Sequence, residues 1–575
     1  MTINNTIHDY FIKNGFVKVS SGRDLPKELT IQFRRYNYLY RGTLPVEDNK
    51  YKVDIILGFQ SIPFHTWPKC FLAEPAKVAK HSQAHVEPNG AYCYVDSESN
   101  NLDISRPLES LIFTIETLRI SLEKSFSGIN QNDIATELPL YLQNDYITEF
   151  YDNNAKEFEC IEYNENSALR YVIRPKKLDS NIATLLWEPI KYVPKKKLSF
   201  IKVNLDSPPQ LNEDLPITSL RLLVRWLEKN QARSLAQLTA NIHKAVNNKK
   251  KNDKIAILFQ YEVNDDTINF AVILSLSSVG VNLFKGAAPR RLRKIMATWN
   301  DNLCTFSFNT SRVINVNPVN GVIRNIPNRN FLDLRIALIG AGTLGGYVSE
   351  QLVNLGAGLK LNENKVVLDI FDSGTLEPDN LSRHALGYTA LWQNKALALA
   401  QKLKKDNPLL QSSLRGIDKN ISFDNIDHLK NYDLIINATG DQHSTDTLNY
   451  YWYITPIDRP IVHGWIEGSG LGCRIIRLHN KSSCSRCLRE LNNTPRYRVF
   501  KNNDDVPIIK KSCGSSYIPY PPTVSIRSAS LIVEAALDAI HLNDDNYIYF
   551  DSMSDKLVVH KDKKLTKHNQ CPICC

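Results

Sequence analysis

The stretch that most constrains the fold is Leu334–Gly346, which reads LRIALIGAGTLGG. An apolar, β-branched run leads directly into Gly340, Gly342 and Gly345, and the helical pattern YVSEQLVNLGAG follows. This is G-x-G-x-x-G in a strand–turn–helix context. The glycines allow a tight turn and a close approach of the backbone to phosphate, while the helix N-terminus supplies N–H groups for an anion. We therefore expect an α/β Rossmann-like domain that binds a nucleotide here.

The second strand of this domain, KVVLDIFD, ends at Asp372, where a carboxylate is able to accept a hydrogen bond from a ribose hydroxyl. Taken alone, the pattern favours an NAD enzyme. The segment that follows, however, contains Asn380, Arg383 and Lys395. Arginine and lysine beside phosphates neutralise charge that develops in phosphate chemistry, which hydride transfer does not require. We therefore expect ATP as the nucleotide.

These ordered elements resemble the ubiquitin-activating and ThiF/MoeB adenylating family. That family shows G-x-G-x-x-G, then D-x-D-x-x-x-x-x-N-L-x-R, then a lysine about a dozen residues on. Here the second element is DSGTLEPDNLSR, with Gly374 in place of the second acid. The resemblance implies that Asp372 holds the ATP ribose. It also implies that the phosphates are contacted by Asn380, Arg383 and Lys395.

The resemblance also implies a magnesium site and a second subunit. The family binds Mg²⁺ through an aspartate after its fourth strand; here that strand is DLIINATGDQ, with Gly440 in the expected place and Asp441 next. We assign Mg²⁺ to Asp441, with a helix-capping role as the alternative. The family is homodimeric and borrows an arginine from upstream of the partner's glycine loop, for which Arg324 and Arg329 are the candidates.

Two C-x-x-C pairs lie in the C-terminal region. Paired C-x-x-C motifs supply the four thiolates of a tetrahedral structural zinc site, and the adenylating family carries such pairs. Redox chemistry is the competing function of a C-x-x-C motif. Cys473 lies in an apolar strand, so we expect it in the core. The predicted zinc ligands are Cys484, Cys487, Cys571 and Cys574.

Cys513 follows two lysines and precedes an apolar helical segment. Nearby cations lower the pKa of a thiol and raise its thiolate fraction. The resemblance implies that a cysteine at this place takes the activated carboxylate as a thioester, so Cys513 is the candidate nucleophile. A buried structural cysteine is the alternative.

The N-terminal region predicts an α+β domain of short strands, a proline-containing loop (SIPFHTWPK), a cysteine loop and a helix (LESLIFTIETLRISLEKS). The loop AHVEPNGAYC contains His85, Gly90 and Cys93. This order resembles ubiquitin-conjugating enzymes, particularly divergent bacterial ones. The resemblance implies that Cys93 carries an acyl thioester, polarised by Asn89 or by His85. A packed core thiol is the alternative for Cys93.

We therefore expect three domains: residues 1–150 conjugating-enzyme-like, 151–325 a mixed linker domain, and 326–575 an adenylating domain. This order resembles a bacterial family associated with cyclic-oligonucleotide antiphage (CBASS) defence, which joins the C-terminus of a cGAS-like nucleotidyltransferase to lysine-bearing targets. The implied cofactors are ATP, Mg²⁺ and structural Zn²⁺. Activation of a sulfur carrier and a non-catalytic nucleotide-binding scaffold are the alternatives.

Composition fits a reduced, aqueous compartment. The sequence contains no apolar run long enough to span a bilayer, and its polar N-terminus lacks the plan of a signal peptide. We expect the cytoplasm, where thiols stay reduced, so eleven cysteines favour metal ligands and reactive thiols. The net charge of +10 includes three basic runs, interpreted as solvated surface rather than a patch for nucleic acid. We expect neither a membrane nor a nucleic-acid partner.

Overall fold

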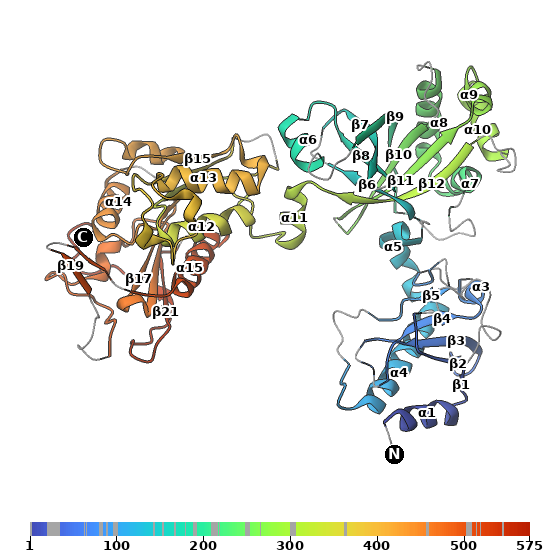
Figure 1. Ribbon diagram of the computed structural model, residues 1–575, viewed down its shortest axis with the longest axis horizontal. Coiled ribbons are helices and arrows are strands. Elements are labelled where there is room, and N and C mark those ends of the chain that lie inside the picture. The colour runs from blue at the N-terminus through green and yellow to red at the C-terminus, as the bar shows by residue number, and fades with distance from the viewer. Residues whose placement is uncertain are drawn as a thin grey trace. The chain divides into compact units, whose positions relative to one another are not determined.

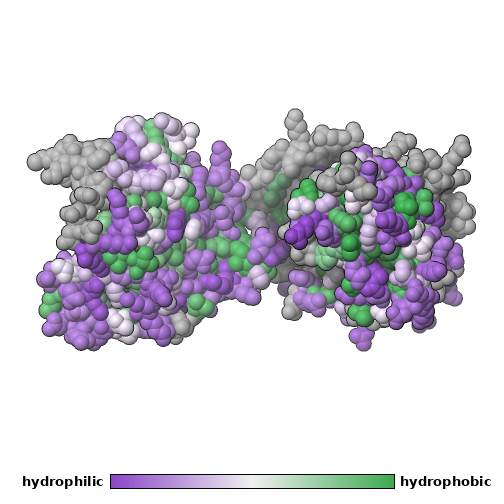
Figure 2. Space-filling view, turned by 90° about the horizontal axis from the view of Figure 1, so that it is seen from below, coloured by the Kyte–Doolittle hydropathy of each residue, from purple (hydrophilic) through white to green (hydrophobic). Residues whose placement is uncertain are grey.

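The computed structural model forms two compact units, one of residues 1–177 and 190–316 and the other of residues 178–189 and 317–575. No helix in the described part of the chain is long and apolar enough to cross a membrane. On the face seen in Figure 2, hydrophilic side chains cover most of the surface, with hydrophobic ones scattered between them. The structure describes residues 3–574 apart from 20–34, 63, 65, 80–83, 88–89, 96–101, 142–143, 152–154, 166–167, 179, 188–192, 209–216, 218, 248–253, 265, 299–305, 362–364, 456–458, 502–508, 513–514, 518 and 543–544.

The N-terminal domain is an antiparallel sheet in the order β1-β2-β3-β4-β5 (Figure 1). Its strands are β1 (Val17–Lys18), β2 (Tyr38–Val46), β3 (Tyr51–Phe59), β4 (Lys69–Leu72) and β5 (Ala91–Tyr92). Its helices are α1 (Ile3–Lys13), α3 (Pro75–Ala79) and α4 (Pro107–Phe126). The long helix α4 starts with a proline, which needs no N–H partner in the first turn. Leu111, Leu118 and Leu122 form its buried stripe and pack into the domain core.

Helix α5 (Ile134–Tyr141) connects this sheet to the second half of the unit. Its Leu138 is fully buried in the hydrophobic cluster of the second half. The hydroxyl of Tyr261 donates a 2.7 Å hydrogen bond to the carbonyl oxygen of Ala135. Helix α5 is therefore anchored in the linker domain.

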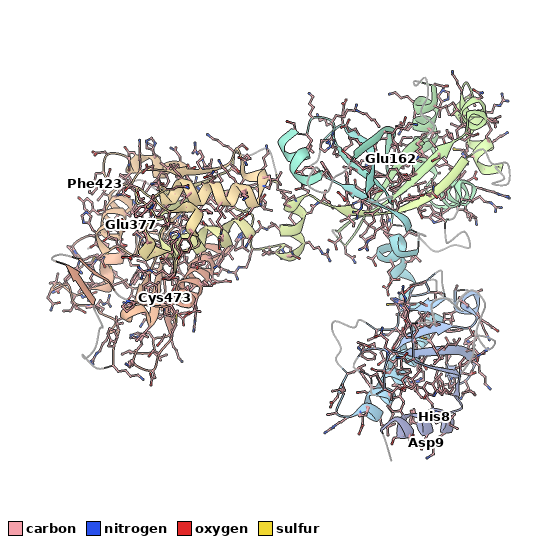
Figure 3. All side chains as sticks on the ribbon, viewed as in Figure 1. His8, Asp9, Glu162, Glu377, Phe423 and Cys473 are labelled. Carbon is pink, nitrogen blue, oxygen red and sulfur yellow. The ribbon has the colours of Figure 1, made fainter. Side chains whose placement is uncertain are left out.

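The linker domain is a closed barrel in the order β10-β11-β12-β6-β8-β7-β9, an architecture that the sequence patterns did not indicate. Helices pack against its β9–β11 side, and Glu162 on β7 is buried beside Lys254 (Figures 1 and 3). The barrel strands are β6 (Asn144–Phe150), β7 (Phe158–Glu165), β8 (Ala168–Pro175), β9 (Val193–Asn204), β10 (Lys254–Val263), β11 (Asp266–Leu276) and β12 (Phe306–Asn315). The helices are α7 (Leu220–Asn230), α8 (Ala232–Asn247), α9 (Ser278–Phe284) and α10 (Pro289–Thr298).

The C-terminal unit is built on an eight-stranded sheet in the order β15-β14-β13-β16-β17-β18-β21-β22. The first five strands of this order are parallel and the remaining ones are antiparallel. The sheet strands are β13 (Arg335–Ile339), β14 (Val367–Phe371), β15 (Leu414–Ile417), β16 (Leu434–Asn437), β17 (Ile461–Glu467), β18 (Gly472–Leu478), β21 (Tyr547–Ser552) and β22 (Lys563–Lys564). A separate hairpin consists of β19 (Ile509–Ser512) and β20 (Ser515–Tyr517).

Alternation along the strands divides the side chains of this sheet between two hydrophobic layers. Ile336 and Leu338 of β13 pack in one layer with α12 (Thr343–Asn354), α13 (Lys395–Asp406) and α15 (Pro522–His541). Ala337 and Ile339 pack in the other layer with α14 (Gln442–Ile454). A parallel sheet covered on both faces places the ends of its strands at one edge, where ligands bind. The helices are α6 (Ser180–Trp187), α11 (Pro318–Asn325), α12 (Thr343–Asn354), α13 (Lys395–Asp406), α14 (Gln442–Ile454) and α15 (Pro522–His541).

Candidate active site

The glycine loop lies between β13 and α12, as the sequence predicts. Gly340 has a φ of +97°, which favours glycine, and a Cβ atom there would meet the backbone nitrogen of Thr439 at 2.9 Å. A Cβ atom on Gly345 would lie 1.9 Å from the carbonyl oxygen of Gly340, so this position packs the helix against the loop. Gly342, by contrast, has open space at its Cβ position and is the N-cap residue of α12, where it provides no side-chain hydrogen bond. The N-terminus of α12 therefore offers uncapped N–H groups to an anion.

Asp372 braces this loop. Its Oδ2 accepts a 2.7 Å hydrogen bond from the Ala341 N–H, and its Oδ1 accepts one of 2.7 Å from the Gly374 N–H. A Cβ atom on Gly374 would lie 2.9 Å from Asp372 Oδ1 and 3.4 Å from Lys395 Nζ. The turn therefore leaves no room for a second acid at position 374 without displacing one of these groups. Each carboxylate oxygen of Asp372 keeps a lone pair for a ribose hydroxyl.

His384 holds the same loop from the other side and is a residue that sequence reasoning missed. Its Nδ1 accepts a 3.0 Å hydrogen bond from the Leu386 N–H, so Nε2 carries the proton and donates to the Ala341 carbonyl oxygen at 2.9 Å. Burial lowers the pKa of His384, and the positive charges of Lys395 and Arg383 act in the same direction. The ring is therefore held neutral beside the cationic groups.

Arg383 and Lys395, two of the predicted phosphate contacts, lie near this loop. The Nε atom of Arg383 is buried and has no hydrogen-bond partner in the described part of the chain. Its guanidinium lies 5.0 Å from the centre of the Tyr520 ring. Lys395 is the first residue of α13, and its backbone N–H bonds to the Gly374 carbonyl at 2.8 Å. The third predicted contact, Asn380, caps a turn, with its Oδ1 accepting from the Glu377 N–H at 3.1 Å.

Asp441 is the N-cap of α14. Its Oδ2 accepts hydrogen bonds from the Ser444 backbone N–H at 2.7 Å and from the Ser444 hydroxyl at 2.8 Å. These bonds lower the pKa of Asp441. The capping role that was the alternative for this residue is therefore present. Because both bonds use Oδ2, a metal ion would approach through Oδ1, and carboxylate oxygen is a ligand that Mg²⁺ accepts.

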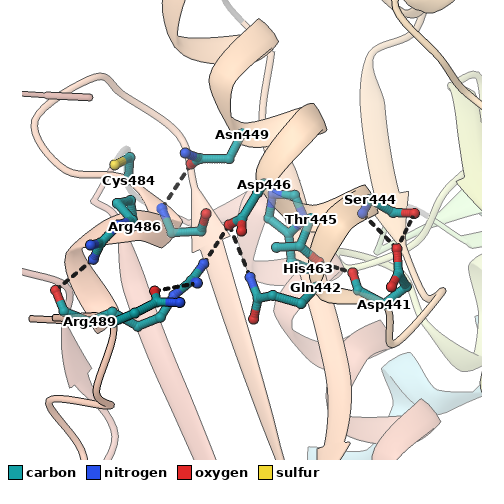
Figure 4. A network of polar contacts seen from close by, with 12 residues as sticks. Asp441, Gln442, Ser444, Thr445, Asp446, Asn449, His463, Cys484, Arg486 and Arg489 are labelled. Atoms are coloured by element: carbon teal, nitrogen blue, oxygen red, sulfur yellow. Dashed lines mark hydrogen bonds and ion pairs between the residues drawn. The ribbon is translucent and has the colours of Figure 1, made fainter. Parts of the chain in front are cut away.

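A polar network runs from Asp441 along α14 to the first C-x-x-C turn (Figure 4). Gln442 donates to Asp446 at 2.9 Å, and Asp446 also pairs with Arg489. Further along the helix, Asn449 accepts a 2.8 Å hydrogen bond from the Ser485 N–H, between the two cysteines. The helix thus joins the end of β16 to the cysteine region.

The four cysteines predicted to bind zinc form one buried cluster, in which all four sulfurs lie within 4.8 Å of one another. The Sγ distances from Cys484 are 3.9 Å to Cys487, 3.6 Å to Cys571 and 3.7 Å to Cys574. Tetrahedral zinc with Zn–S bonds of about 2.3 Å would separate its sulfurs by about 3.8 Å. The donor set and spacing therefore fit zinc. Cys473 is also where we expected it, buried on β18 (Figure 3), and burial raises the pKa of its thiol to about 12.

The two upstream arginines differ in their surroundings. Arg329 pairs with Asp538 of α15 at 2.6 Å and lies 3.5 Å from Glu534. Arg324, in the last turn of α11, is exposed. Cys513 lies outside the described residues, so the structure does not place the predicted thioester cysteine.

Cys93 follows β5 and is the one exposed cysteine among the eight that the structure describes. The preceding Tyr92 is buried and shares its hydroxyl with Ser121 and Ser125 of α4, at 3.0 and 2.8 Å. The following Tyr94 donates to the Pro68 carbonyl at 2.7 Å. Two anchored tyrosines thus hold the thiol at the surface, which rules out the alternative of a core cysteine at position 93.

His85 is tied into the same loop. The Cys93 N–H donates to the His85 carbonyl oxygen at 2.9 Å, and His85 adopts a φ of +66°. Its Nδ1 lies 2.9 Å from Glu137 Oε1 and its Nε2 lies 3.2 Å from Asp133 Oδ2. The Glu137 hydrogen bond raises the pKa of His85. Neither acid was singled out from the sequence, because each lies about fifty residues further along the chain. Asn89, the other residue proposed to polarise a thioester, lies outside the described residues.

Residues 323–573 match the model of the ThiF family, and residues 26–149 match that of prokaryotic E2 family B. A relative from Escherichia coli (strain TW11681), called ATP-dependent ubiquitin transferase-like protein Cap2, is 27% identical over 558 residues, which cover 91% of each chain. This chain is a Cap2-like protein. Its N-terminal E2 domain and C-terminal ThiF domain have the α+β and Rossmann-like folds predicted from the sequence.

Two more relatives of the same name match parts of this Cap2-like chain. The one from Pseudomonas aeruginosa (strain BWHPSA011 / Pa011) is 31% identical over 259 residues, covering 44% of this chain and 45% of the relative. The one from Vibrio cholerae serotype O1 (strain ATCC 39315 / El Tor Inaba N16961) is 27% identical over 373 residues, covering 62% of this chain and 61% of the relative.

Proposed function

We propose that this chain activates the C-terminal carboxylate of a protein by adenylation and passes it through two cysteines to an amine of a target. The observation that carries the proposal is Cys93. It is an exposed thiol in an E2 domain, on the same chain as a ThiF domain whose glycine loop is open to phosphate at Gly342. An E2 thiol receives an acyl group, and an adenylating domain produces one.

In the first step, a carboxylate oxygen of the substrate attacks the α-phosphorus of ATP. The bond from the α-phosphorus to the bridging oxygen breaks, and pyrophosphate leaves with that electron pair. The N-terminus of α12 binds phosphate, Arg383 and Lys395 stabilise the developing charge, and Asp372 bonds the ribose. Mg²⁺ at Asp441 would neutralise phosphate oxygens.

In the following steps, the acyl group moves between sulfurs. The Cys513 thiolate attacks the acyl carbon and AMP leaves; the Cys93 thiolate then attacks the same carbon and releases Cys513. A lysine amine finally forms an amide and releases the Cys93 thiol. The engagement of both His85 ring nitrogens by carboxylates supports a role for His85 in positioning the Cys93 loop, rather than in polarising a carbonyl.

We further propose that the activated protein is a cGAS-like nucleotidyltransferase with a free C-terminus, acting in cytoplasmic CBASS antiphage defence. The support is the likeness to Cap2 over nearly the whole chain and the order of the E2 and ThiF domains. A homodimer, with Arg324 of one subunit reaching the other subunit's nucleotide, completes the proposal. The exposure of Arg324 leaves it available for that contact.

The test is an ester trap. Full-length Cys93→Ser protein is co-expressed with its genomic neighbours, and intact masses are taken after denaturation. An oxygen ester is more stable than a thioester, so we expect an ATP-dependent mass gain equal to a neighbour's mass minus one water. The gain must be absent in Cys93→Ala. Pyrophosphate exchange without any gain in Cys93→Ser, together with a thiocarboxylate product, would favour sulfur-carrier activation instead.

A further inference from the structure

An open basic cleft runs along the outer edge of the ThiF sheet. Strand β15 is the first strand of the sheet order, so one of its sides has no neighbouring strand in the described part of the chain. The cleft has a volume of about 1260 Å³ and is lined by β14, β15, α13 and the turn 425–432. It extends from Lys419, just after β15, to Lys365 and Arg335, at the start of β14 and β13.

The charge of this lining is strongly one-sided. Lys365, Lys404, Lys405 and Lys419 line the cleft, and no ion pair joins any of them to a carboxylate in the described residues. The one acid in the lining, Asp369, is fully buried and neutralised by Arg415 at 2.5 Å. The cleft therefore offers several cations and no exposed carboxylate.

The backbone of β15 is accessible to an occupant of the cleft at one outward position. Ser413 and Ile417 direct their carbonyl groups to β14, where they accept from the Leu368 and Asp372 N–H groups. In a parallel ladder, alternate residues bond to the same neighbour, so Leu414 and Gly416 direct their backbone groups away from β14. Leu414 is fully buried, whereas Gly416 is partly exposed and lines the cleft. Gly416 therefore offers its backbone N–H and carbonyl groups to an extended peptide in the cleft, and side-chain pockets then give specificity.

Apolar side chains complete the cleft. Ile417 and Ile421 line it from the sheet side, and Leu397 of α13, which is 49% exposed, lines it from the helix side. Nearby, Phe423 is 61% exposed at the outside of the unit (Figure 3). An occupant that alternates acidic and apolar side chains would match both sets of groups.

We propose that this cleft binds an extended acidic polypeptide segment, which hydrogen-bonds to the backbone of Gly416 and places its carboxylates against the cleft lysines. The backbone groups of Gly416 and the apolar side chains that line the cleft favour polypeptide over nucleic acid, because a peptide supplies both backbone partners and apolar side chains. The proposal goes beyond the acyl-transfer function, because no residue assigned to nucleotide chemistry lines the cleft.

The experiment uses the full-length chain and a fluorescein-labelled peptide of alternating glutamate and valine, with binding followed by fluorescence anisotropy. A glutamine–valine peptide is the neutral control, and a peptide N-methylated on alternate residues removes strand donors. A labelled single-stranded oligonucleotide tests the other class of polyanion. We expect the acidic peptide to bind more tightly than these three probes, with an affinity that falls as salt rises.

Matched lysine variants locate the site. Lys404→Glu should weaken binding of the acidic peptide by about fivefold or more. Lys561→Glu, at an exposed lysine of the same unit that does not line the cleft, should leave it unchanged. ATP–pyrophosphate exchange should be the same in both variants, so loss of peptide binding is separable from failure of the adenylating function. Equal binding of the glutamine–valine peptide, tighter binding of the oligonucleotide, or no difference between the two variants would overturn the proposal.

Discussion

The ring of His85 lies with its Nδ1 2.9 Å from Glu137 Oε1, and the backbone N–H of His85 donates to the second oxygen of the same carboxylate at 3.0 Å. One side chain of α5 thus holds both the backbone and the imidazole of the loop that carries Cys93. Because Leu138 of the same helix is buried in the linker domain, the position of the Cys93 loop depends on two domains.

Removing this carboxylate should loosen the loop in a pH-dependent way. In Glu137→Gln, we expect faster hydrogen exchange in residues 84–95, by a factor that corresponds to about 1–3 kcal/mol. The pKa of His85 is raised in the folded protein, so the ion pair contributes fully below its ordinary pKa of 6.5 and is lost as pH rises through the raised value. The effect should be larger near about pH 6 than near about pH 9.

The measurement is hydrogen exchange by mass spectrometry on full-length variants, each compared with the unchanged protein at the same pH. Glu74→Gln is the matched control, since Glu74 is largely exposed and 3.7 Å from Lys77. An equal effect of Glu137→Gln at both pH values would contradict the ion pair.

The glycine loop predicts opposite outcomes for two similar variants. Gly342→Ala adds a methyl group to open space, so stability should stay within about 0.5 kcal/mol. ATP affinity should fall at least about tenfold, because the methyl group blocks the approach of phosphate. Gly345→Ala forces a Cβ atom against the Gly340 carbonyl and should cost about 1–3 kcal/mol of folding stability. Thermal unfolding measures the effect on stability, and titration with ATP measures the effect on binding. An unchanged ATP affinity in Gly342→Ala would exclude binding of phosphate at the N-terminus of α12.

Position 384 should tune nucleotide binding through the loop. His384→Leu removes the donor to the Ala341 carbonyl, and we expect a loss of about 1–2 kcal/mol in ATP binding. His384→Gln, which keeps a donor, should retain more affinity. Since burial lowers the pKa of His384, the neutral ring contributes stability that is fully present above its ordinary pKa of 6.5 and is lost as pH falls through the lowered value. Isothermal titration with ATP at two pH values measures the difference in affinity between His384→Leu and the unchanged protein. A difference that stays the same at the lower pH would contradict this prediction.

The cysteine cluster should hold one metal ion per chain. We expect about one equivalent of zinc by elemental analysis of purified protein. Cys487→Ser should lose zinc and unfold at lower temperature, whereas Cys473→Ser, a buried cysteine outside the cluster, should keep it. Full zinc retention in Cys487→Ser would contradict four-thiolate coordination.

The sequence was sufficient to predict those parts of the molecule that local patterns specify. The glycine loop, Asp372, the four cysteines and the long helix after Cys93 each carry a spacing that chemistry or periodicity imposes, and the structure places all of them in the expected elements. The exposure of Cys93 excludes the packed core thiol that the sequence had left open, whereas its thioester role stays a prediction.

What the sequence did not indicate depends on contacts between distant residues. The linker barrel closes through strands such as β6 and β12, which lie more than 150 residues apart and carry no motif. Glu137 reaches His85 across 52 positions, and Asp441 took a capping role that composition alone does not distinguish from metal binding. These outcomes follow from three-dimensional packing rather than local pattern.

Helix α14 has a consequence for how this chain responds to its surroundings. Its first turn is capped by Asp441 beside the proposed nucleotide site, and Asn449, two turns later, holds the backbone between Cys484 and Cys487. If loss of the metal displaces that turn, the affinity for nucleotide changes too. By thermodynamic reciprocity, bound nucleotide then changes the affinity for the metal by the same factor. Oxidants or chelators that remove the metal from the cysteine cluster would then lower the rate of acyl activation without reacting with a catalytic group.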